Sequence, residues 1–438
     1  MRTFFIIWFG QFISSIGSSM TNFAIKLWVW ELTSQVTTLA LLSLFTLIPS
    51  ILITLISGLI VDRVNRKILM IIGDAVAAIS TVFICYFYLN NQLETWHLYL
   101  TSAVNGAFGE IQSLAYSASI SMLVPKQQYT RATSMNSTIH YGSIIIAPGL
   151  AGVLYYIIHL SGILVIDLVS FTIAIATIFT VHIPQLNINN KSHNAINFWQ
   201  EIIFGFRYLV ARPSLLAMIA TGSLFWFFHD IGATLSSAMI LARTNNNATV
   251  LGSISSAAGL GGVIGTIILS IWGGSQRRIN GFLLGMIGAG ISKTVFGFAQ
   301  GLMIWLPAQF CSSLNFPMLT SSSTAILLSK VRPDFQGRVF ATESSIQQIV
   351  SAIAVFISAL LADRIFEPAM MPGGNLTALF SGLFGTGKGA GMALLYVISS
   401  LGLLLVGLSG YTNPKVRNVE YIVPDYDVES PQAAKTSS

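Results

Sequence analysis

Three side chains that could carry protons lie in the middle of long apolar segments of the chain. Glu110 lies near the centre of one such segment, and His229 and Asp230 lie side by side near the centre of another. A charged group at that depth costs roughly 2.5 kcal/mol or more on membrane-insertion scales, so it is a functional candidate by default. A carboxylate there can take up a proton from one side and release it to the other as its solvation alternates, and His229 can relay protons. The alternative for each residue is a buried hydrogen bond between helices.

An aromatic run directly precedes His229 and could form the wall of a substrate site. It reads Phe225-Trp226-Phe227-Phe228, and ligand pockets are lined mainly by apolar and aromatic side chains. Trp226 is therefore the candidate for substrate contact. Packing between helices or contact with lipid is the alternative, because aromatic residues at helical spacing are common in both settings.

The remaining ionisable residues of the apolar segments lie nearer to the segment ends. Asp74 lies about two helical turns, roughly 10 Å, into its segment. We expect it to pair with an arginine of the neighbouring loop rather than to bind substrate. Three other carboxylates are expected to have structural roles near the membrane surface: Asp167, Glu343 and Asp363. Two lysines are expected to extend their ammonium groups towards water: Lys26 and Lys293.

The composition shows what kind of element must position these side chains. Of the 438 residues, 53% are hydrophobic and 9% are charged, whereas soluble proteins carry about 25% charged residues. The mean hydropathy of +0.73 is that of a chain whose main solvent is lipid. The apolar runs are much longer than the roughly 10-residue strands of an outer-membrane barrel, so the backbone must form helices. This excludes an ordinary soluble enzyme and predicts an all-α membrane protein.

Charges, prolines and turn residues divide the chain into twelve predicted transmembrane helices, each close to the ~20 residues that cross a bilayer. Of the 22 Lys and Arg residues, 17 lie in alternate loops on one side, three lie on the other side and two lie within spans. Because positive loops stay in the cytoplasm, both termini are expected to be cytoplasmic. The predicted spans are 4–30, 38–61, 67–89, 97–123, 134–158, 161–183, 215–241, 250–272, 280–299, 301–328, 340–362 and 389–411.

The long polar connection in the middle of the chain separates six spans from six. We predict an N-terminal half, 1–184, a linker, 185–214, and a C-terminal half, 215–411. The linker is amphipathic over Phe198–Val210, which indicates a surface helix. The polar tail, 412–438, is expected to be disordered.

The two halves also resemble each other in sequence. The segment V-P-K-Q-Q-Y-T-R that begins at Val124 parallels V-R-P-D-F-Q-G-R, which begins at Val331. A weak repeat of six spans is typical of transporters built from two pseudosymmetric halves that move about a central site.

The loop after the second span carries a recognisable motif. It runs from Gly58 to Lys67 and resembles the major facilitator signature G-x-x-x-D-R-x-G-R-K/R, with Asn65 in place of the second glycine. Asn tolerates left-handed backbone, so this substitution need not break the turn. The resemblance implies a gate whose ion pairs break when the halves move; a loop that serves only topology is the alternative. The gate residues are Gly58, Asp62, Arg63, Arg66 and Lys67, together with Asp74.

Other segments are similar to the multidrug and macrolide-efflux-like branch of that superfamily. They include Trp8 to Gly17, Ala115 to Ala118 and Leu123 to Lys126. Asn105 lies near the position at which many proton-coupled relatives carry an arginine. The fifth span is similar to a loose exporter motif, for which an ordinary kinked helix is the alternative. The residues of this motif are Gly142, Pro148, Gly149 and Gly152.

The resemblance implies the major facilitator fold and a secondary transporter that exports hydrophobic or amphipathic small molecules by alternating access. Proton antiport in the cell (inner) membrane is the expected mechanism, because the sequence has no nucleotide-binding motif that could supply energy. A metabolite importer or uniporter on the same fold is the first alternative, and a channel-like membrane protein is the second. We expect no enzymatic activity, cofactor, metal, nucleic acid or obligate protein partner; the expected partners are substrate, proton and lipid.

Overall fold

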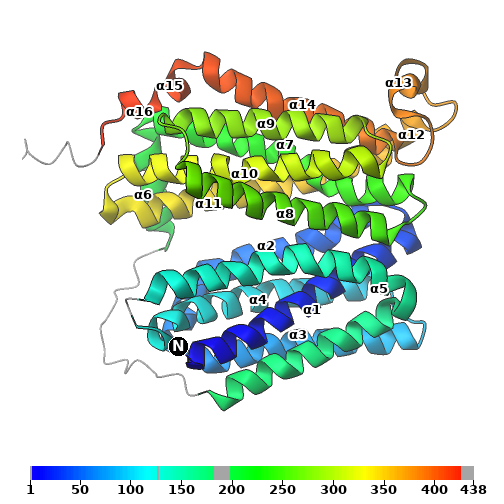
Figure 1. Ribbon diagram of the computed structural model, residues 1–438, viewed down its shortest axis with the longest axis horizontal. Coiled ribbons are helices and arrows are strands. Elements are labelled where there is room, and N and C mark those ends of the chain that lie inside the picture. Colours follow the sequence, from blue (N-terminus) through cyan, green and yellow to red (C-terminus); the bar gives the residue numbers. More distant parts are fainter. Residues whose placement is uncertain (1, 126–127, 182–197, 426–438) are drawn as a thin grey trace, which may run out of the picture. The chain divides into compact units, whose positions relative to one another are not determined.

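A computed structural model describes residues 2–125, 128–181 and 198–425 of the chain, and in these residues the secondary structure is helical with no strand. Figure 1 shows long helices that lie alongside one another within each part of the chain. The long helices are α1 (Arg2–Thr33), α2 (Val36–Arg63), α3 (Arg66–Leu89), α4 (Thr95–Leu123), α5 (Tyr129–Thr180), α7 (Pro213–Arg243), α8 (Ala248–Trp272), α9 (Arg278–Phe298), α10 (Leu302–Lys330), α11 (Pro333–Leu361) and α14 (Ala390–Thr412). The short ones are α6 (Phe198–Val210), a π-helical turn (Ala362–Phe366), α12 (Glu367–Met370), α13 (Thr377–Phe384), α15 (Pro414–Arg417) and α16 (Val419–Ile422).

The chain forms two compact units. Unit 1 comprises Met1–Ser192 and Ser237–Gly259, and unit 2 comprises His193–Ser236 and Leu260–Ser438. The units differ from the predicted halves in one segment, since 237–259 packs with unit 1. The predicted surface helix is present as α6, and it packs in unit 2, where Gly205 lies against the backbone of Arg338 in α11.

The helices account for the predicted spans as follows. Within the described residues, nine helices are both long and apolar enough to cross a membrane. α4 and α10 are 29 residues long each but more polar. The 52-residue α5 covers predicted spans five and six, and its backbone breaks at His159, where φ is 54°. The predicted number of twelve spans is reached when α5 is counted as two spans and when α4 and α10 are added to these nine helices.

The gate loop gives Asn65 a role that the sequence did not predict. Asn65 has a φ of −56°, so it is not left-handed, and its side chain accepts a hydrogen bond from the backbone N–H of Lys67 at 2.9 Å. It therefore caps the start of α3. Lys67 Nζ in turn donates to the carbonyls of Phe179 and Val181, at 3.2 and 2.7 Å, and satisfies the free end of α5.

The internal repeat is visible in matching contacts. Arg66, at the start of α3, donates from Nη1 to the carbonyl of Ala118 in α4 at 2.9 Å. Arg278, at the start of α9, donates from Nη1 to the carbonyl of Ala325 in α10, also at 2.9 Å. Each unit thus uses an arginine at a helix start to hold the following helix of its hairpin.

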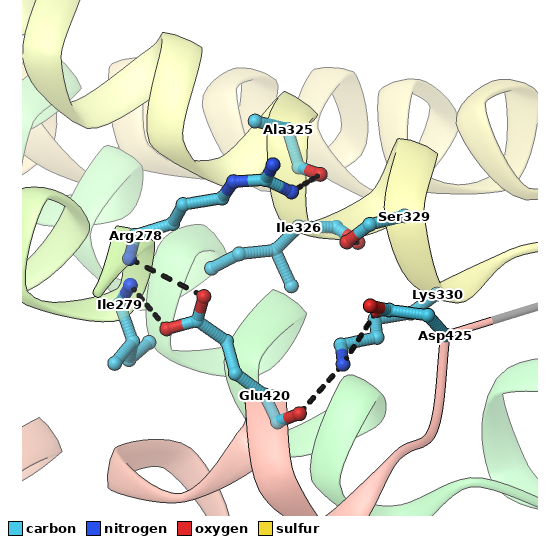
Figure 2. A network of polar contacts seen from close by, with 8 residues as sticks. All are labelled: Arg278, Ile279, Ala325, Ile326, Ser329, Lys330, Glu420 and Asp425. Carbon is cyan, nitrogen blue, oxygen red and sulfur yellow. Dashed lines mark hydrogen bonds and ion pairs between the residues drawn. The ribbon is translucent and has the colours of Figure 1, made fainter. Parts of the chain in front are cut away.

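The prediction that the chain is disordered after 412 is wrong for the residues described up to Asp425. α15 and α16 pack on unit 2 because three valines at helical spacing are buried: Val416, Val419 and Val423. Figure 2 shows the polar contacts of this tail. Glu420 accepts from the N–H groups of Arg278 and Ile279 at 3.3 and 3.1 Å, and its carbonyl accepts from Lys330 Nζ at 2.6 Å. Lys330 also pairs with Asp425 at 2.8 Å.

Candidate functional site

Unit 1 contains a polar cavity of about 470 Å³. α1 and α4 each contribute a stripe of polar residues at helical spacing, which turns towards the cavity because a helix repeats every 3.6 residues. Of the described residues that line it, none is Lys, Arg or His, whereas two are aspartates, Asp74 and Asp167. The two stripes are Gln11, Ser14, Ser15, Ser18 and Asn22 on α1, and Thr101, Asn105, Gln112 and Tyr116 on α4.

Asp74 lies in this cavity between two amide side chains. It is 1% exposed, and its carboxylate accepts from Gln112 Nε2 at 2.6 Å and from Gln11 Nε2 at 3.0 Å. Hydrogen bonds to an ionised acceptor are strong, so the two amides offset much of the cost of burial. We expected an arginine as the partner of Asp74, whereas the structure shows these two amides. The side chain of Arg63 lies outside the described residues.

Two atoms in the cavity wall are ready to accept or donate a further hydrogen bond. The side-chain oxygen of Asn105 and the hydroxyl of Tyr116 are buried and make no hydrogen bond within the described residues. Buried polar atoms are paired in nearly all proteins, so such atoms beside a cavity are suited to a ligand or to water. The cavity therefore combines anionic groups with unpaired polar groups.

Glu110 lies elsewhere on α4. It is not among the described residues that line this cavity, and its carboxylate accepts from Ser50 of α2 at 3.4 Å. Gln112 is two residues further along, which turns it about 200° around the helix. The depth of a residue within its predicted span carries no information on the direction in which its side chain points.

Unit 2 contains a second cavity, of about 330 Å³, with a more aromatic wall. Trp226 lines it, as do Phe282 and Phe340, and Trp226 is stacked on Phe316 with ring centroids 5.7 Å apart. Glu343, for which a structural role near the membrane surface is expected, also lines this cavity. Trp226 is the residue of the aromatic run in α7 that lines this cavity.

The charged residues of α7 lie outside that cavity. His229 packs against aromatic rings, with Phe316 at 4.9 Å and Trp226 at 5.0 Å, and its Nδ1 has no hydrogen-bond partner among the described residues. The backbone carbonyl of Asp230, the next residue of α7, accepts from Thr234 Oγ1 at 2.7 Å.

The expectation that Lys293 reaches water is wrong. The residue is 4% exposed, and its Nζ lies 3.4 Å from the hydroxyl of Tyr396 and 5.6 Å from the centre of that ring. The side chain faces Tyr396 of α14 inside unit 2. Lys26, by contrast, is exposed, and Asp363 lies in the π-helical turn.

The exporter-like motif of the fifth span mediates close helix packing within unit 1. A Cβ on Gly152 would lie 2.7 Å from the carbonyl of Ala248, and one on Gly149 would lie 2.9 Å from Ser256 Oγ. Pro148 lies inside α5, and Gly142 faces the ring of Phe12. The glycines therefore allow α5 to approach α8 and α1 closely, as expected for such residues. Of the gate residues, Arg66 and Lys67 make the contacts given above, while the surroundings of Gly58 and the side chains of Asp62 and Arg63 lie outside what the structure describes.

The sequence reasoning missed the amides and hydroxyls of the unit 1 cavity. The signal was present, since polar residues recur on α1 and α4 at steps of three and four. No group of His, Cys, Asp and Glu suited to a metal ion occurs among the described residues.

The fold and the two cavities define a polytopic membrane transporter. The family model of the Major Facilitator Superfamily matches residues 7–355. The chain therefore belongs to the Major Facilitator Superfamily.

Comparison with individual proteins supports an efflux transporter. Macrolide efflux protein A of Streptococcus pyogenes is 29% identical over 368 residues, which cover 83% of this chain and 90% of that protein. Macrolide efflux protein A of Enterococcus faecalis is 28% identical over 304 residues, which cover 68% of this chain and 93% of that protein.

Two solved structures share the fold. The nucleoside transporter NupG has a TM-score of 0.71 at 10% identity, covering 93% of this chain and 99% of its own. An inward-facing bacterial homologue of the human lysosomal transporter Spinster has a TM-score of 0.68 at 14% identity, covering 93% and 95%.

Proposed function

We propose that this protein exports hydrophobic or amphipathic small molecules of the macrolide type from the cell, in exchange for protons. Alternating access of the two halves would move the substrate, in an inner membrane with both termini in the cytoplasm. The two relatives named macrolide efflux protein A support the substrate class. The aromatic wall at Trp226 in unit 2 suits the apolar part of such a molecule.

The observation that carries the coupling proposal is the position of Asp74. It is a buried carboxylate in a cavity whose described lining holds no basic side chain, and the two amides that hold it carry no charge. A proton is the simplest means of neutralising it, and the amides fix the carboxylate in both protonation states. We therefore assign the coupling proton to Asp74 in preference to Glu110.

Transport into inverted vesicles tests this function. A radiolabelled macrolide should accumulate when the lumen is acidic, because protons leaving the lumen drive substrate inward. A membrane potential of 100 mV supplies ~2.3 kcal/mol per charge, or an approximately fiftyfold gradient for one proton. A protonophore should abolish accumulation. Equilibration that the protonophore leaves unchanged would show a uniporter, and accumulation in right-side-out vesicles would show an importer; either result contradicts the proposal.

A further inference from the structure

Glu343 of α11 is a carboxylate without a partner in the wall of the unit 2 cavity. It is half-buried, and within the described residues its side chain makes no hydrogen bond and no ion pair. None of the described residues that line this cavity is Lys, Arg or His. An ionised carboxylate that is partly removed from water is costly unless it is paired. The cavity therefore offers a negative charge that its described lining does not neutralise.

The two carboxylates of the unit 1 cavity differ from Glu343 in this respect. Asp74 accepts hydrogen bonds from two amides. Asp167 is 1% exposed and accepts from Ser18 Oγ and from Thr81 Oγ1, each at 3.3 Å. Both aspartates thus have partners within their own unit. Of the three cavity carboxylates, Glu343 is the one that is available to a ligand.

The internal repeat supports a role for this position in the cavity. The offset that aligns Val124 with Val331 also aligns Asn136 of α5 with Glu343 of α11. Asn136 lines the unit 1 cavity and Glu343 lines the unit 2 cavity. The same position of the repeat therefore faces a cavity in each unit, and it carries a charge in unit 2 alone.

Aromatic rings line the cavity beside the carboxylate. Trp226 of α7, Phe282 of α9 and Phe340 of α11 all contribute to the wall, and Trp226 is stacked on Phe316 with ring centroids 5.7 Å apart. The face of an aromatic ring attracts a cation, and tryptophan does so most strongly. A carboxylate together with aromatic rings is the combination that recognises an ammonium group.

An apolar groove adjoins the cavity within unit 2. It has a volume of about 440 Å³ and lies between α7 and α11, with Phe227 and Ile346 in its wall. Ile219 and Ser223 line both the groove and the cavity, and Ser223 is the one polar residue among those described in the groove. The cavity itself, at about 330 Å³, lies at the lower end of the roughly 300–1,000 Å³ typical of ligand pockets. Together they suit a molecule with a charged group at one end and an apolar body.

We propose that Glu343 and Trp226 bind the protonated amine of the exported molecule, so that the protein selects amphipathic molecules that carry one positive charge. The carboxylate is the counter-charge, the aromatic rings contact the ammonium group, and the apolar body lies in the groove. This inference rests on the proposed export function and names its substrate class. A singly charged substrate exchanged for one proton moves no net charge, so the pH difference drives its export.

Equilibrium binding of radiolabelled benzyltrimethylammonium to the purified full-length protein, in an uncharged detergent, tests this site. The probe keeps its charge at every pH and has no N–H group, so its charge and its phenyl ring are what the protein can recognise. We expect saturable binding to the wild type. Benzenesulfonate, an aromatic anion, should not compete.

Variants assign the binding to the two residues. Glu343→Gln should weaken it roughly tenfold or more, because one partner of a charge pair is removed. Trp226→Leu should weaken it roughly threefold or more, and Trp226→Phe should weaken it less, because an aromatic face remains. Glu110→Gln makes the same chemical change as Glu343→Gln in unit 1 and is the matched control, with wild-type affinity expected.

Three results would overturn the site: no saturable binding by the wild type, equal binding by the wild type and Glu343→Gln, and competition by benzenesulfonate as strong as that by the unlabelled probe. If Glu343→Gln does not fold, Trp226→Leu decides, and wild-type affinity in that variant overturns the proposal. Macrolide uptake into vesicles reports separately on the proposed function. Binding with the expected pattern by a protein that moves no macrolide would support this site and contradict that function.

Discussion

The contact between Glu420 and the start of α9 makes a quantitative prediction about the C-terminal tail. α9 begins at Arg278, and its N-cap residue, Arg277, supplies no side-chain cap. The carboxylate of Glu420 accepts the free N–H groups instead, at 3.3 and 3.1 Å (Figure 2). The first N–H groups of a helix have no partner within the helix, so this acceptor replaces a missing cap.

Glu420→Ala removes both acceptor oxygens, and loss of a cap costs about 0.5–2 kcal/mol. Glu420→Gln keeps the shape of the side chain and one acceptor oxygen but loses the charge. A charge at a helix end contributes about 0.3–1 kcal/mol, and a hydrogen bond to a charged group is stronger than one to a neutral group. We therefore expect Glu420→Gln to cost about 1 kcal/mol of local stability. A loss of 1–2 kcal/mol corresponds to a roughly 5- to 30-fold change in a local opening equilibrium.

Hydrogen exchange followed by mass spectrometry measures that opening. Peptides that cover the start of α9 and the tail helices, α15 and α16, should exchange roughly fivefold faster in Glu420→Gln, and faster still in Glu420→Ala. Glu343→Gln makes the same chemical change in the wall of the unit 2 cavity and should leave these peptides unchanged. Wild-type exchange rates at α9 in Glu420→Ala would refute the assignment of Glu420 as the cap.

Three further predictions concern other contacts. Asn65→Ala should lower the free energy of unfolding by about 1 kcal/mol and Asn65→Gly by only a few tenths, because Asn65 is a cap; equal losses in thermal unfolding would contradict this. Gly152→Val should reduce macrolide transport more than tenfold by separating α5 from α8, whereas Gly262→Ala, with open space at its Cβ, should transport normally. Lys293→Met and Asp230→Asn should each destabilise the protein, and the double variant should recover about 0.5–3 kcal/mol in chemical unfolding; strict additivity would show that the two charges do not interact.

The sequence predicted the helical architecture well because that information is local. Apolar length and loop charge were enough to find the long helices, and the amphipathic period of 198–210 was enough to find α6. The tail was missed because its mean polarity hid the three- and four-residue spacing of Val416, Val419 and Val423, which shows only when a partner surface exists.

The candidate site was less predictable because its members come from different helices. Asp74, Gln11 and Gln112 are distant in sequence, and only tertiary packing brings them together. Depth within a span singled out Glu110, yet the direction of a side chain around its helix decides which cavity it enters. The burial of Lys293 likewise depends on α14, which no local pattern in α9 reveals.

Substrate-evoked proton release tests the central claim that Asp74, in the unit 1 cavity, carries the coupling proton. Inverted vesicles are loaded with a pH-sensitive dye, given an acidic lumen, and exposed to a macrolide. Wild type and Glu110→Gln should both release protons when substrate is added, whereas Asp74→Asn should release none at the same protein level. Normal release in Asp74→Asn together with its loss in Glu110→Gln would contradict the account and return the coupling site to the middle of α4.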